Sequence, residues 1–132
     1  MLRTALSPNA PLVEANWLSE HLNDAIVLDC SVERIEGAQG ETFFAPGHAL
    51  FERGHIPNAR FADVLGAFSD PRAPYPFTCP TRTGIENAAR EIGIDNDSIV
   101  VAYDTLGGAY AARLWCVFTA FGFSNVLVLN GG

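Results

Sequence analysis

Asp104 is the residue whose type and position most invite chemistry. It ends the apolar run "IVVAYD" (99–104), and a turn formed by Thr105, Leu106, Gly107, Gly108 and Ala109 follows it. A turn that leads from a buried strand into a helix can direct several backbone N–H groups inward, with the positive end of the helix dipole behind them. Such a turn stabilises an anion. A cysteine at position 104 would become a thiolate nucleophile there, whereas a carboxylate carries comparable charge but cannot form a persulfide.

Asp29 and Asp63 also end predicted strands, so three carboxylates can meet at the carboxyl edge of a parallel sheet, where open α/β folds bind ligands. They could form a metal or phosphoryl-transfer site, or they could accept hydrogen bonds from loop and helix amides, which we favour. An aspartyl phosphatase would need an acidic residue in place of Leu106, and a receiver-type site would need a lysine, which the chain lacks. "DTLGGAY" matches neither GxGxxG nor GxxxxGK[ST], so nucleotide binding has weak support.

The cysteines Cys30, Cys79 and Cys116 are odd in number and contain no CxxC pair, which argues against a zinc site or a disulfide framework. We expect reduced thiols. Cys30 directly follows Asp29 and is the one thiol near the expected site, so it is the alternative sulfur acceptor, although no glycine-rich turn follows it. We expect Cys116 to pack in the core and Cys79 to be exposed in a loop.

Apolar runs predict the strands that position these residues, at 25–29, 59–63, 99–104 and 125–130. The longer runs do not alternate, as is typical of strands buried on both faces of a parallel sheet. Helical spacing predicts helices over 14–22, over 83–93 and after the turn as far as Gly122. For the second of these, Thr83 and Glu86 form a predicted capping box and Gly93 a stop.

This alternation of strands and helices indicates an α/β fold of three layers, with helices on both faces of a mainly parallel central sheet. Two segments rich in glycine and proline, 31–57 and 69–80, show no period, and we expect both to be long loops. The last predicted strand is followed only by "GG". Since a parallel sheet needs cover on both faces, we expect one domain over 1–132 that is truncated before its last helix.

Composition limits the class of protein. The 132 residues, 48% of them hydrophobic, suit one domain with one core. The net charge is −7, and the eight basic residues are scattered arginines, so we expect no nucleic-acid partner. No apolar run reaches the roughly 20 residues of a membrane span, and the N-terminus lacks the apolar region of a signal peptide. We therefore expect no membrane partner and a cytoplasmic location.

Four motifs together resemble the N-terminal rhodanese domain of tandem thiosulfate or 3-mercaptopyruvate sulfurtransferases. They are "VLDCS", "GHIPNARF", "IVVAYD" with its turn and "AARLW", and "VLVLNGG", and the similarity covers nearly all of residues 12–132. The resemblance implies a rhodanese-like fold and two domains side by side, of which only the second carries the catalytic cysteine. The first usually has aspartate at the position of Asp104, so the resemblance implies that this chain is non-catalytic.

The resemblance also implies partners and chemistry. The partner is a catalytic second rhodanese domain, and the intact enzyme moves sulfane sulfur from thiosulfate or 3-mercaptopyruvate to cyanide or thiols without a metal or organic cofactor. His55, in "GHIP", either borders the cleft between the domains or caps the turn before Ile56 and Pro57. Arg113 either holds the loop through ion pairs or hydrogen bonds, or contacts substrate.

Two alternatives stay open. The chain could be a stand-alone rhodanese-like domain that binds a protein partner through residues 104–109 and the open flank of the sheet. It could also be a sulfur carrier that depends on Cys30.

Overall fold

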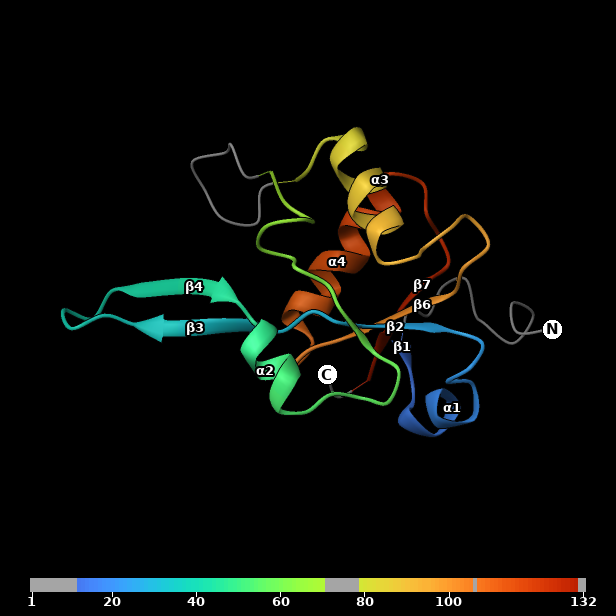
Figure 1. The fold of residues 1–132 in the computed structure, drawn as a ribbon, viewed down its shortest axis with the longest axis horizontal. Coiled ribbons are helices and arrows are strands. Elements are labelled where there is room, and N and C mark those ends of the chain that lie inside the picture. The colour runs from blue at the N-terminus through green and yellow to red at the C-terminus, as the bar shows by residue number, and fades with distance from the viewer. Residues whose placement is uncertain (1–11, 71–78, 106, 131–132) are drawn as a thin grey trace.

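The computed structural model describes residues 12–70, 79–105 and 107–130. Its centre is a sheet (Figure 1) of five strands, and the strand order is β1-β7-β6-β2-β5. The strands are β1 (Leu12–Val13), β2 (Ile26–Asp29), β5 (Arg60–Phe61), β6 (Val100–Tyr103) and β7 (Val126–Leu129). Each pairs parallel with its neighbours. The expected α/β fold with a parallel sheet is confirmed. The two-residue strand β1 was not predicted, because so short a segment has no period.

Helices cover both faces of the sheet, and each face has its own core. The helices are α1 (Ala15–Glu20), α2 (His48–Arg53), α3 (Arg82–Glu91) and α4 (Ala109–Ala120). On the α3 and α4 face, Leu28 and Ala102 pack with Leu114. On the opposite face, Val27 and Val101 pack in a cluster that includes residues of α1 and α2 (Figure 1). The strands are therefore apolar on both faces, which explains why their sequences do not alternate.

The helix ends agree only partly with expectation. Gly93 and Gly122 follow α3 and α4 with φ of 85° and 87°, a left-handed conformation that favours glycine. The predicted capping box of Thr83 and Glu86 is wrong. Thr81 is the N-cap of α3, because its extended backbone lets the hydroxyl accept the N–H of Gly84 at 3.0 Å, and Thr83 lies inside the helix.

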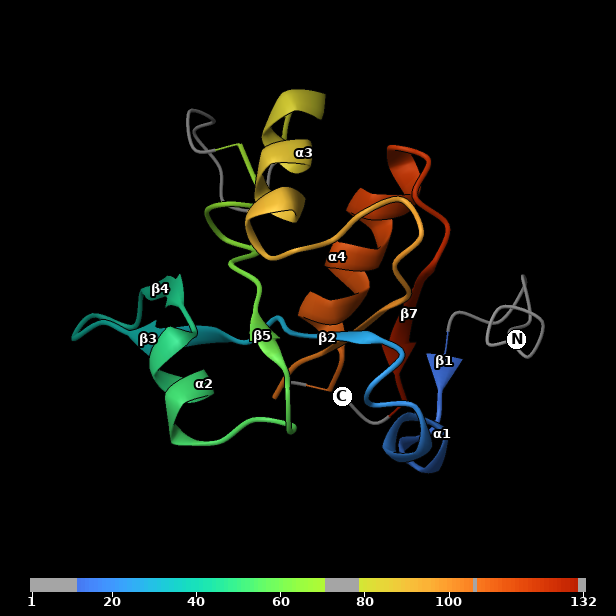
Figure 2. The ribbon, with the colours of Figure 1, turned by 45° about the vertical axis from the view of Figure 1, so that its right-hand side comes forward.

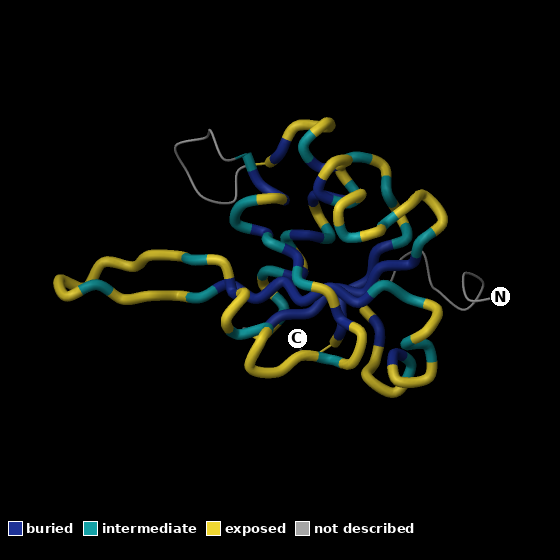
Figure 3. The backbone as a smooth tube through the Cα atoms, in the orientation of Figure 1, coloured by how far each residue is buried: buried dark blue, intermediate teal, exposed yellow. Residues whose placement is uncertain are grey.

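The expected loop over 31–57 is also wrong, because this segment folds into a hairpin and a helix. Strands β3 (Val32–Glu36) and β4 (Thr42–Pro46) pair antiparallel in a ribbon that extends away from the sheet, and α2 follows (Figure 2). Most of the ribbon is exposed (Figure 3), so it has no core face to impose an apolar period. Of the second expected loop, residues 71–78 lie outside the described ones. In the described ranges, no helix is both long and apolar enough to cross a membrane.

Candidate functional site

Asp104 is buried at the carboxyl end of β6, where the chain turns into α4. Its Oδ1 accepts the backbone N–H of Gly108 at 2.9 Å, and its Oδ2 accepts those of Tyr110 and Ala111, each at 2.8 Å. The first N–H groups of a helix lack partners within the helix and carry the positive end of its dipole. Three amides therefore converge on one carboxylate, in the arrangement expected of an anion-holding turn.

Two glycines give this turn its shape. Gly107 and Gly108 have φ of 72° and 95°, in the left-handed region that L side chains rarely adopt. A Cβ atom at either position would meet nothing within 4 Å, so the backbone conformation rather than lack of space requires glycine. Of the other turn residues named from the sequence, Thr105 and Ala109 are exposed, and Leu106 lies outside the described residues.

A second buried carboxylate, Asp29, ends the neighbouring strand β2, in register with Tyr103. Its Oδ1 accepts the N–H of Ser31 at 2.9 Å, and its Oδ2 accepts the hydroxyl of Tyr103 at 3.1 Å. The same hydroxyl accepts the N–H of Ile56 at 3.0 Å. Tyr103 thus joins the ends of β2 and β6 to the segment that follows His55. Tyr103 was not identified from the sequence, where its place directly before Asp104 is the only signal.

Burial raises the pKa of Tyr103 to about 12, and the nearby Asp29 carboxylate acts in the same direction. The hydroxyl therefore keeps its proton at ordinary pH and can donate a hydrogen bond to Asp29.

The third strand-end carboxylate, Asp63, closes a local turn. Its Oδ1 accepts the N–H groups of Leu65 at 3.2 Å and Gly66 at 2.8 Å. Asp29, Asp63 and Asp104 therefore all accept hydrogen bonds from backbone amides, as the structural interpretation of these residues predicted. Within the described ranges, no group of three or more histidine, cysteine, aspartate or glutamate side chains could hold a metal ion.

Cys30 directly follows Asp29 and is close enough to both buried carboxylates to be affected by their charges, but it is poorly suited to accept sulfur. It is fully buried, and its thiol is 3.8 Å from the carbonyl oxygen of Leu28. Burial raises the pKa of the thiol well above its ordinary value, and the charges of Asp104 and Asp29 raise it further. A raised pKa disfavours the thiolate, which is the nucleophilic form.

The two remaining cysteines are both exposed. This was predicted for Cys79. The prediction that Cys116 packs in the core was wrong, because Cys116 lies on the outer side of α4 while its neighbours Leu114 and Val117 are the buried residues.

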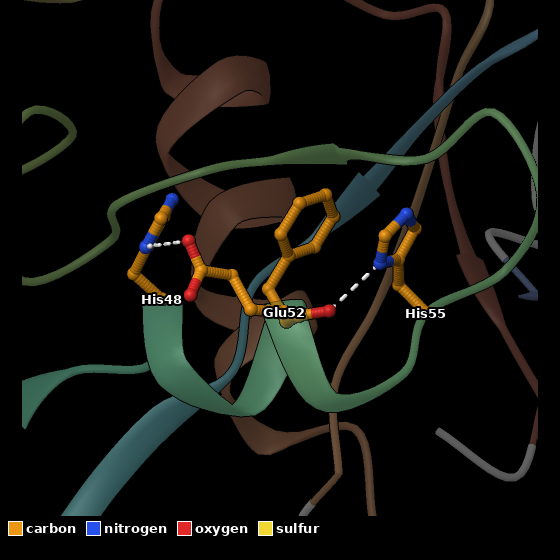
Figure 4. Close-up of polar contacts among 4 residues, drawn as sticks. His48, Glu52 and His55 are labelled. Carbon is orange, nitrogen blue, oxygen red and sulfur yellow. Dashed lines mark hydrogen bonds and ion pairs between the residues drawn. The ribbon is translucent and has the colours of Figure 1, made fainter.

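His55 is exposed just after α2 (Figure 4). Its Nδ1 lies 2.7 Å from the carbonyl oxygen of Phe51, and its ring stacks on the Phe51 ring with centroids 3.8 Å apart. Since a carbonyl only accepts, Nδ1 carries the proton, and Nε2 is the nitrogen that can meet a further partner. These contacts hold the end of α2 in place. In the same view, Nδ1 of His48 lies 3.4 Å from Glu52. Arg113 is half-buried on α4.

The topology therefore brings Asp29, Cys30, Tyr103 and Asp104 together at the carboxyl ends of the adjacent strands β2 and β6. Backbone amides donate hydrogen bonds to both carboxylates of this site. The pKa of its one thiol is raised, which disfavours the nucleophilic thiolate.

Comparisons with known proteins agree with this fold. The sequence model of the rhodanese-like domain family matches residues 14–132 of this chain. Thiosulfate sulfurtransferase of Gallus gallus is 34% identical over 123 residues, covering 92% of this chain and 42% of that protein. The enzyme of the same name from Bos taurus is 41% identical over 134 residues, covering 92% and 41%. For 3-mercaptopyruvate sulfurtransferase of Escherichia coli (strain K12), identity is 32% over 120 residues, covering 91% and 41%.

A solved structure gives the same result. The crystal structure of a 3-mercaptopyruvate sulfotransferase from Escherichia coli superposes with a TM-score of 0.78 at 29% identity, covering 94% of this chain and 46% of that one. The chain spans less than half the length of each of these relatives.

Proposed function

This chain belongs to the rhodanese-like family, and on that premise we propose that it is the non-catalytic N-terminal domain of a thiosulfate or 3-mercaptopyruvate sulfurtransferase. The observation that carries the proposal is the turn around Asp104. Amides of Gly108, Tyr110 and Ala111 bind its carboxylate where a reactive thiolate would be stabilised. A carboxylate cannot form a persulfide, so the turn keeps its shape without its sulfur chemistry.

In the intact enzyme, the thiolate would come from a second rhodanese domain. That thiolate attacks the outer sulfur of thiosulfate, the S–S bond breaks, and sulfite leaves with the electron pair. Cyanide then takes the outer sulfur of the persulfide as thiocyanate, which restores the thiolate. The relatives that this chain matches are more than twice its length, which gives them room for such a domain. The role of this chain is to pack against that domain and form one wall of the cleft, with His55 at its border.

Cyanolysis of the purified chain tests the proposal. The chain is incubated with thiosulfate, freed of small molecules and treated with cyanide, and thiocyanate is measured for the wild type and for Cys30→Ser. We expect neither protein to give more thiocyanate than a blank without protein, and an active thiosulfate sulfurtransferase serves as the positive control. Stoichiometric thiocyanate from the wild type would refute the proposal, and its loss in Cys30→Ser would identify Cys30 as the acceptor.

A further inference from the structure

The ribbon of β3 and β4 concentrates exposed apolar side chains. Ile35, Phe43 and Phe44 are 45%, 54% and 37% exposed, and among the described residues they are three of the four large hydrophobic side chains that are exposed. The ribbon extends away from the rest of the chain (Figures 2 and 3). A two-stranded ribbon without a further layer is marginally stable in water, and its open edges are templates for another strand. The ribbon therefore has the character of an interaction surface.

The register of the ribbon shows which backbone groups face outward. The N–H of Gly37 donates to Glu41 at 2.7 Å, and that of Gly47 donates to Ser31 at 3.1 Å. Because antiparallel partners alternate between bonded and non-bonded pairs, the odd-numbered residues of β3 direct their N–H and C=O groups toward β4. The even-numbered residues Arg34 and Glu36 direct theirs to the outer edge of β3.

We propose that two copies of this chain pair through this outer edge, antiparallel, about a twofold axis at Ile35. Ile35 then lies opposite Ile35 of the partner subunit in a non-bonded pair. Arg34 lies opposite Glu36 of the partner subunit in a hydrogen-bonded pair, and the twofold axis repeats that pair on the other side. The two ribbons form one four-stranded sheet, and two pairs of opposite charge stabilise it.

The same register also places apolar side chains of the two copies next to one another. Ile35 is already paired with Phe43 across the ribbon. Across the axis, Phe43, Ile35, the partner's Ile35 and the partner's Phe43 form a continuous apolar row on one face. An axis at Arg34 would instead oppose two arginines and place Glu36 against Val32 of the partner subunit. Since a contact between two ribbons buries less area than a standard protein interface, the dimer is weak and reversible. It is independent of the sulfurtransferase assignment.

Charge exchange tests this pairing by sedimentation velocity over a concentration series of the whole chain. We expect wild type to show a reversible monomer–dimer equilibrium. Arg34→Glu and Glu36→Arg each turn two attractive pairs into repulsive ones and should raise the dissociation constant about tenfold or more. The double variant Arg34→Glu with Glu36→Arg should restore wild-type affinity. The matched control Glu33→Arg lies outside the charge pairs and should change the constant much less. A wild type that stays monomeric, or a double variant no better than the singles, would overturn the proposal.

Cross-linking gives a second readout that does not depend on affinity. In a background with Cys79→Ser and Cys116→Ser, which removes the exposed thiols, Ile35→Cys places two thiols across the axis. Non-bonded antiparallel partners have Cα atoms about 4.5 Å apart, close enough for a disulfide. We expect mild oxidation to give a covalent dimer. Phe43→Cys lies on the same face but one strand further from the axis, so it should give little covalent dimer. Equal cross-linking of the two variants, or none with Ile35→Cys, would contradict the proposed axis.

Discussion

Among single residues, Asp104 is the one that the turn into α4 holds most firmly through backbone amides. The carboxylate accepts three main-chain hydrogen bonds while buried. Hydrogen bonds to a charged acceptor contribute more than neutral ones, and removing the acceptor leaves the amides of the first turn without partners. Asp104 is therefore expected to stabilise the fold, whatever the turn does chemically.

Asp104→Ala should lower the free energy of unfolding by about 3 kcal/mol, because it removes an acceptor shared by three amides. Asp104→Asn should lower it less, since the amide oxygen still accepts. Urea unfolding followed by circular dichroism measures both. The control Asp24→Ala, at an exposed aspartate beyond α1, should lie within about 0.5 kcal/mol of wild type. A cost for Asp104→Ala no larger than that of the control would show that the three bonds add nothing to stability.

The raised pKa of Tyr103 predicts that the free energy of unfolding falls at alkaline pH. Its pKa is about 12 in the folded chain and about 10 when unfolded, so the folded chain holds its proton more tightly. The stabilising effect is complete below about pH 10 and is lost as the pH rises toward 12. Urea unfolding of wild type should show this decline. In Tyr103→Phe the decline should be smaller, and a decline of equal slope in both proteins would contradict the assigned shift.

Among the secondary-structure elements, apolar patterns in the sequence predict the strands that are buried in the core. They miss the elements that lie mainly in solvent. Strands β2, β6 and β7 carry continuous apolar runs because both faces are buried, and those runs were enough to predict them. The ribbon has no buried face and α2 contains no buried residue, so no apolar period marks either of them. The cap of α3 was misplaced because two threonines flank Arg82, and only the backbone conformation distinguishes them.

The cap of α3 can be tested directly. Thr81→Ala should lower the free energy of unfolding by about 1 kcal/mol, because the hydroxyl that accepts the N–H of Gly84 is lost. Thr83→Ala, at an exposed position inside the helix, should leave stability unchanged or raise it slightly, since alanine has the higher helix propensity. Thermal unfolding compares the two. A larger loss of stability with Thr83→Ala than with Thr81→Ala would instead support the capping box of Thr83 and Glu86.

The turn into α4 is a second test at this scale. Gly108→Ala should lower the free energy of unfolding by about 1–2 kcal/mol. The φ of 95° at this position is unfavourable for a residue with a Cβ atom, although space for that atom is available. Gly54 is a matched control, since its φ of 171° is ordinary extended backbone and a Cβ there also meets nothing within 4 Å. Gly54→Ala should change the unfolding midpoint little. Equal effects at the two glycines would argue against a strained turn.

At the scale of the whole molecule, the topology assembles the site. Asp29 and Asp104 lie at the same edge of the sheet because β2 and β6 are parallel neighbours, and this placement follows from predicted strands that end in aspartate. Asp63 follows β5, the other parallel neighbour of β2, and its carboxylate accepts the N–H groups of Leu65 and Gly66 there. The bridge from Tyr103 to Ile56 joins residues 47 apart, so it depends on tertiary packing that no local pattern reports.

Under the proposed function, the amides around position 104 form a site suited to a sulfur anion, and the carboxylate of Asp104 occupies it. The most direct test is the thiol pKa of Asp104→Cys, measured from the pH dependence of alkylation in the Cys79→Ser and Cys116→Ser background. We predict a pKa clearly below the value of about 8.5 for a free cysteine. Ala112→Cys, on the exposed side of α4, should titrate near that ordinary value. A pKa at or above about 8.5 for the thiol at position 104 would show that the turn does not stabilise a sulfur anion.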